Sequence, residues 1–131
     1  MKTRNIFKGA ALAFAIAHSA NADEIQRMTV AELSARCTAQ NTETQALCLG
    51  LATGVLSQLQ ANGNFYMGGR MSEEARSILQ LAGAACSPVE PKLALMAFIN
   101  WSKIHPEKQR WNGLSGLASA IQEAWPCKEH L

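Results

Sequence analysis

The chain has 131 residues and a formal net charge of +2. Three of its twelve basic residues lie within residues 1–22, which contain none of the ten acidic ones. Without that segment the chain has 109 residues and a charge of −1. This length suffices for one domain with a single core, and the charge removes the main electrostatic argument for binding nucleic acid.

The N-terminus has the pattern of a secretory signal peptide. Basic residues come first, Gly9 to Ala17 is an uncharged apolar run, and Ala20-Asn21-Ala22 offers small residues at the positions that a signal peptidase reads. We expect cleavage before Asp23 and a single periplasmic domain over residues 23–131. No segment reaches membrane-spanning length, so no membrane association is expected after cleavage.

The exported chain keeps an even number of cysteines: Cys37, Cys48, Cys86 and Cys127. In an oxidising compartment such a set indicates two disulfides. A zinc site is the alternative, but no pair has C-x-x-C spacing, and only His105 and His130 offer nitrogen ligands. We therefore expect disulfides, no metal and no cofactor.

Two helices are predicted first along the exported chain. Thr29 and Glu32 form a capping box, which begins a short helix. Its apolar side carries three residues at helical spacing: Val30, Leu33 and Cys37. After Asn41, Thr42 with Gln45 suggests a second cap. That helix is predicted to run to about residue 61, where the Asn-Gly pair at 62–63 ends it.

The second helix has two contrasting faces. One is apolar and is predicted to face the core: Cys48, Leu51, Val55 and Leu59. The other carries only small residues, which let a neighbouring helix approach closely: Ala46, Gly50, Thr53, Gly54 and Ser57.

Residues 62–71 have the composition of a loop, rich in Asn and Gly. Phe65, Tyr66 and Met67 are large apolar residues that are costly to leave in water, and Arg70 adds a charge. Because binding residues favour loops, these four are predicted to bind a partner. The alternative is that the loop folds back over the core.

Three more helices are predicted. Ser72 opens a short one that Gly83 closes, and Pro91 begins a fourth that ends before Pro106. The fourth is apolar almost all round, which places it at the centre of a core or partly in a homodimer interface. Asn112 caps the fifth, whose apolar stripe is the cleanest in the chain: Leu114, Leu117, Ala118, Ile121, Ala124 and Trp125.

The remaining tryptophans are expected in different surroundings. Trp101, like Trp125, lies on an apolar stripe and is predicted to be in the core. Trp111 follows Lys108 and its polar neighbours, lies off the stripes, and is a further candidate partner-binding residue. His105, before Pro106, is expected to terminate a helix.

These elements predict an all-α, disulfide-stapled bundle of four to five helices. Four cysteines allow three pairings. Short connections favour antiparallel neighbours, which would bring Cys37 to Cys48 and Cys86 to Cys127. We favour that pairing.

The ordered spacing of several short motifs resembles the Rap/Tai family, the immunity proteins that protect bacteria from type VI secretion amidase effectors. The matching residues are Cys37, Cys48-Leu49-Gly50 with Gly54, Cys86 with Pro88, His105-Pro106-Glu107, and Trp125-Pro126-Cys127. The resemblance implies an all-helical, often dimeric periplasmic protein that binds a peptidoglycan amidase and occludes its active site.

Two other functions remain open. An enzyme would need Cys37 or Cys48 as a nucleophile beside His105, but oxidised cysteines cannot attack. A small periplasmic acid-stress chaperone, or another protein-binding module, would share the export, the size and the helices. Such a chaperone would act through apolar faces that protonation uncovers.

Overall fold

The computed structural model describes residues 22–68 and 71–127. These residues form a helical turn at 22–27 and then five α-helices and one 3₁₀ helix, without a strand: α2 (Val30–Thr38), α3 (Thr42–Met67), α4 (Glu73–Ala82), α5 (Pro91–Ile104), η1 (Pro106–Lys108) and α6 (Gly113–Ala124). The predicted all-α, disulfide-stapled bundle is confirmed. The predicted signal peptide lies, except for its last residue, outside the described residues.

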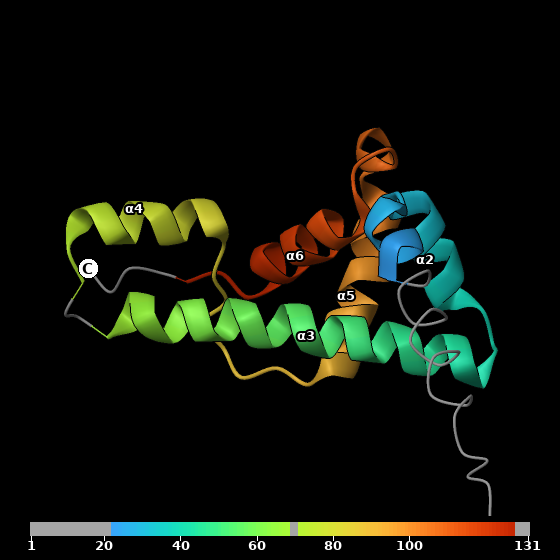
Figure 1. Cartoon of the computed structure of the whole chain (residues 1–131), viewed down its shortest axis with the longest axis horizontal. Coiled ribbons are helices and arrows are strands. Elements are labelled where there is room, and N and C mark those ends of the chain that lie inside the picture. The colour runs from blue at the N-terminus through green and yellow to red at the C-terminus, as the bar shows by residue number, and fades with distance from the viewer. Residues whose placement is uncertain (1–21, 69–70, 128–131) are drawn as a thin grey trace, which may run out of the picture.

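The long helix α3 organises the molecule (Figure 1). Its 26 residues extend about 39 Å at 1.5 Å per residue. Helices α2 and α5 pack against its N-terminal half, α6 lies over its middle, and α4 runs beside its C-terminal part. The most deeply buried large side chains come from these packed helices: Val30, Leu33, Cys48, Phe98, Leu117 and Ile121. No helix in the described ranges is long and apolar enough to cross a membrane.

Helix α2 begins at the predicted capping box. The Glu32 backbone N–H donates to Thr29 Oγ1 at 3.3 Å, and the Glu32 carboxylate accepts from the Thr29 backbone N–H at 2.8 Å. The pKa of Glu32 is lowered below its ordinary value by the bonds that its carboxylate accepts, first from the Thr29 backbone N–H and then from the Thr29 hydroxyl. Val30, Leu33 and Cys37 are buried, as predicted.

Both ends of α3 differ from the prediction. Its N-cap is Asn41, whose side-chain oxygen accepts from the backbone N–H groups of Glu43 and Thr44 at 2.9 and 3.3 Å, so Thr42 is the first helical residue and not the cap. At the other end the helix continues past residues 62–63 to Met67. The predicted loop over residues 62–71 is therefore wrong for its first six residues.

A tertiary contact accounts for the extension of α3. The segment 83–87, which follows α4, crosses the helix there: Ala85 N–H donates to the Leu59 carbonyl at 2.9 Å, and the Asn62 side chain donates to the Gly83 carbonyl at 2.8 Å. Gly63 is buried beneath the crossing, where a Cβ would overlap the Ala85 carbonyl oxygen. Asn62 and Gly63 thus hold a neighbouring segment instead of ending the helix.

The buried face of α3 is rotated from the predicted one. The deeply buried residues include Ala52 and Leu56, whereas Leu51 and Val55 are half-buried against the core. The small-residue face lies in solvent, and no atom comes within 4 Å of a Cβ built at Gly50 or Gly54. The predicted close helix–helix contact at this face is absent within the described chain.

Helices α4, α5 and α6 begin as predicted. The Ser72 and Asn112 side chains cap α4 and α6, and Pro91 occupies the first turn of α5. The all-round apolar sequence of α5 is divided: Ala94, Phe98, Trp101 and Ser102 are buried, and Leu93, Met96 and Ile104 are exposed. Phe98 and Trp101 thus share the inner face, while Met96 lies on the outer one.

The disulfides have the favoured pairing. Cys37 and Cys48 join the end of α2 to the start of α3, and Cys86 and Cys127 join the segment after α4 to the residues after α6. All four cysteines are therefore oxidised.

Candidate partner-binding surface

The predicted binding residues Phe65, Tyr66 and Met67 form the last turn of α3 and not a loop. Phe65 and Met67 are 67% and 45% exposed. Tyr66 is only 8% exposed, and the Arg76 guanidinium of α4 lies over its ring at 5.6 Å. Tyr66 therefore packs against α4 and presents little of its side chain to solvent. Arg70 lies outside the described residues.

Trp111, the other predicted binding residue, lies between η1 and α6 and is 46% exposed. This segment is at the far side of the molecule from the C-terminal end of α3 (Figure 1). The structure therefore does not bring the predicted binding residues together. It separates Trp111 from Phe65 and Met67.

The backbone around Trp111 is fixed by the start of α2. The first N–H groups of a helix have no partner within the helix. Here the N–H groups of Val30 and Ala31 donate to the carbonyls of Trp111 and Gln109 at 2.8 and 3.1 Å, and Gly113 N–H donates to the Met28 carbonyl at 2.7 Å. Two chain segments more than 75 residues apart thus hold each other in place.

The indole ring of Trp111 lies against a cation. The Lys108 ammonium is 4.8 Å from the centroid of the Trp111 ring and 5.0 Å from that of the buried Trp101 ring. Glu123 of α6 accepts from Trp101 Nε1 at 2.8 Å and lies 3.9 Å from Lys108 Nζ. One ammonium group therefore links a core tryptophan, an exposed tryptophan and a carboxylate.

His105 completes this cluster. It is the C-cap of α5, as predicted, and its ring packs against Trp101 with centroids 4.7 Å apart. Its two ring nitrogens lie 3.0 Å from a Glu107 carboxylate oxygen and 3.5 Å from one of Glu123. The pKa of Glu107 is lowered, chiefly by its own backbone N–H and then by the hydrogen bond to His105.

We call His105, Glu107, Lys108, Trp111 and Glu123 the Trp111 corner. The sequence singled out Trp111 and His105, and Lys108 only as the start of the segment that carries Trp111, but it predicted no role for Glu123. One signal for Glu123 was present, because it is the sole charged residue of α6. A charged side chain that is partly removed from water needs a polar partner, so a single charge near the end of an uncharged helix is a candidate for such a contact.

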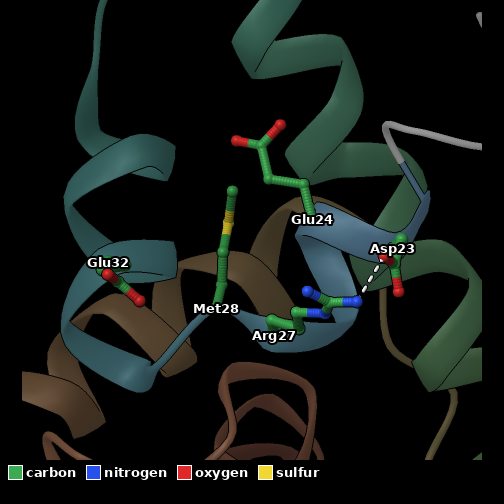
Figure 2. A pocket seen from close by; sticks show the side chains of 5 residues that line it. All are labelled: Asp23, Glu24, Arg27, Met28 and Glu32. Carbon is green, nitrogen blue, oxygen red and sulfur yellow. Dashed lines mark hydrogen bonds and ion pairs between the residues drawn. The ribbon is translucent and has the colours of Figure 1, made fainter.

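An open hollow of about 550 Å³ lies beside residues 22–27 (Figure 2). Its charged residues already have partners. Asp23 pairs with Arg27 at 2.6 Å, Glu24 with Arg36 at 2.9 Å, and Glu32 belongs to the capping box. These contacts account for each charge, and we assign no ligand to the hollow.

The Trp111 corner presents a half-exposed aromatic side chain with charges around it, and the ring nitrogens of its His105 lie near carboxylate oxygens. Within the described ranges no group of three His, Cys, Asp or Glu residues is arranged to hold a metal ion. Such a surface is suited to recognition, because tryptophan supplies a large contact area with few torsions. Comparison of the chain with family models, with curated proteins and with solved structures finds no match.

Proposed function

We propose that the mature protein is a periplasmic immunity protein that binds a peptidoglycan amidase effector of the type VI secretion system and occludes its active site. The motif spacing that resembles the Rap/Tai family is the basis for naming this partner. The observation that carries the binding role is Trp111, an exposed indole whose backbone and ring are both held by contacts.

The disulfides and the exposed apolar residues also support a binding role. Neither disulfide leaves a thiolate for nucleophilic catalysis, and both suit an oxidising compartment. Ile104, directly before His105 in the chain, is also strongly exposed. An aromatic anchor that is already ordered loses little freedom on binding, which favours affinity.

The experiment compares two aromatic truncations at opposite ends of the molecule. Trp111→Ala and Phe65→Ala are tested for inhibition of a type VI amidase effector from the same organism, with purified peptidoglycan as substrate. Loss of a central interface aromatic costs about 2–4 kcal/mol, so Trp111→Ala should weaken inhibition at least thirtyfold. Phe65→Ala is the matched control, and both variants should remain folded by circular dichroism.

The outcomes separate the candidates. Loss of inhibition with Phe65→Ala alone would move the recognition surface to the end of α3. An intact chain that does not inhibit the amidase at stoichiometric concentration would refute the immunity function. Suppression of aggregation of other proteins below about pH 4, where carboxylates protonate, would instead support the acid-stress chaperone.

The proposal includes a homodimer formed partly by α5. Leu93 and Met96 are both half exposed on its outer face, where a second copy would cover them. Sedimentation at micromolar concentration tests the dimer, and a Met96→Glu variant should favour the monomer. A monomeric parent chain would remove this part of the proposal without affecting the inhibitor role.

A further inference from the structure

The contacts of Lys108 differ from those expected of a surface lysine. Its side chain is about three-quarters covered, and its ammonium lies between the Trp101 and Trp111 rings. Trp111 N–H donates to the Lys108 carbonyl at 3.0 Å, so a tight turn places the two side chains next to each other. The face of an indole ring carries negative potential and attracts a cation.

The inner side of this arrangement is firmly held. Trp101 is buried, and its Nε1–H donates to Glu123, which also lies near Lys108. The ammonium thus lies against a buried ring and a carboxylate that is hydrogen-bonded to that ring. Trp111, the outer ring, has the freedom that an exposed side chain normally has unless this cation restrains it.

We propose that Lys108 is a positioning residue, whose ammonium group holds the Trp111 ring in the orientation that a partner protein recognises. The restraint of the ring stands on the contacts above. Its use in recognition rests on the proposed function. A cation–π contact of ~1 kcal/mol corresponds to about a fivefold preference for the restrained orientation.

The test uses the mature chain labelled with 5-fluorotryptophan, which gives one fluorine NMR signal for each of the three tryptophans. Trp111→Phe assigns the Trp111 signal. Lys108→Met keeps the length of the side chain but removes the charge, and it should shift the Trp111 signal toward that of an unfolded chain. Lys108→Arg should keep the signal near its original position, because a guanidinium also stacks on an indole.

Two further variants keep the test specific. Lys103→Met makes the same change at an exposed lysine near the end of α5 and should leave the Trp111 signal unchanged. Glu123→Gln retains an acceptor for Trp101 but removes the counter-charge of Lys108, so it should produce a smaller shift of the same kind. If Lys108→Met does not fold, Glu123→Gln takes its place as the test of the restraint.

The fluorine spectra test the restraint of the Trp111 ring, and the inhibition assay tests its role in recognition. Each claim can therefore be refuted without the other. An unchanged Trp111 signal in Lys108→Met, or in Glu123→Gln if the former is unfolded, would overturn the positioning role. A shifted signal with at least fivefold weaker amidase inhibition supports the whole proposal, and a shifted signal with full inhibition overturns the role in recognition. A parent chain that does not inhibit refutes the proposed function, whereas the spectra still decide the restraint of the ring.

Discussion

The two ends of the molecule display exposed aromatic residues in different ways. At the Trp111 corner, hydrogen bonds from the first turn of α2 fix the backbone and a lysine contacts the ring. At the other end, which we call the hairpin end (residues 59–67 of α3, α4 and residues 83–87), backbone contacts fix the helix, while the Phe65 ring is two-thirds exposed. One end restrains the aromatic ring itself, and the other restrains the helix that carries it.

The hairpin end depends on close backbone approach. Segment 83–87 crosses α3 directly above Gly63, and the Gln60 side chain donates to the Ser87 carbonyl at 3.0 Å. The Cys86–Cys127 disulfide then ties this crossing to the end of α6. A substitution that adds atoms at the crossing should therefore disturb the whole hairpin end.

This difference decides which of the two exposed aromatic side chains is already ordered in the free protein. A side chain that is ordered in the free protein does not lose its rotamer freedom on binding, whereas a freely exposed ring does. The difference amounts to about 0.5–1.5 kcal/mol for one large side chain. On this ground the Trp111 corner is the better candidate for the proposed binding surface, although Phe65 has the larger exposed fraction.

The largest expected effect is at Gly63. A Cβ at this position would overlap the Ala85 carbonyl oxygen and lie 2.8 Å from its carbon, both of which belong to a backbone held by hydrogen bonds and a disulfide. Overpacking of this kind costs about 3 kcal/mol when the neighbour cannot yield. Gly63→Ala should lower the free energy of unfolding by about that amount in urea titration.

The Trp111 signal described above provides the control for Gly63→Ala. If the two ends are independent, this variant should loosen the hairpin end and leave that signal unchanged below the unfolding transition. A stability equal to that of the parent chain would contradict the close crossing.

The second prediction concerns the start of α2, which supports the backbone of the Trp111 corner. Thr29→Ala removes the hydroxyl that accepts from the Glu32 backbone N–H, and loss of such a cap costs about 1 kcal/mol. Thermal unfolding should show a decrease of about 5 °C for a domain of this size. In contrast to Gly63→Ala, this change should also broaden the Trp111 signal.

The capping box also predicts a pH dependence. The Thr29 backbone N–H, and then its hydroxyl, lower the pKa of Glu32 from its ordinary value of 4.5. The contribution of this carboxylate to stability is therefore fully present above pH 4.5 and is lost as the pH falls through the lowered pKa. Glu32→Gln should remove that part of the decline, because a neutral amide does not titrate. An unchanged acid profile would contradict the assignment.

The sequence predicted those features that depend on local chemistry. Capping residues such as Thr29, Ser72 and Asn112 act on N–H groups two or three positions away, so their pattern is visible in the chain. The cysteine pairing followed from helices joined by short connections. These predictions are confirmed.

Features that depend on distant segments were not predictable in this way. Asn62 and Gly63 have the composition of a helix end, and only the crossing of residues 83–87 explains why the helix continues. The Trp111 corner likewise depends on distant residues, because Lys108 contacts Glu123 and Trp101, which lie on two other helices. Polar residues spaced widely along a chain do not reveal that they converge.

The smallest expected effect is on the solvent-facing side of α3, between the two ends. Gly50 and Gly54 lie inside a 26-residue helix, and a Cβ at either position would meet nothing within 4 Å. Glycine costs about 0.5–1 kcal/mol relative to alanine in such a position, because its backbone loses more freedom on folding.

Each of Gly50→Ala and Gly54→Ala should therefore raise the free energy of unfolding by about 0.5–1 kcal/mol, opposite in sign to Gly63→Ala on the same helix. The three variants differ only in position, so urea titration of the set compares the open and the crossed faces of α3 directly. A loss of stability with Gly50→Ala that depends on protein concentration would mean that a second copy approaches this face closely, because a monomeric chain has no atom there for the new methyl group to meet.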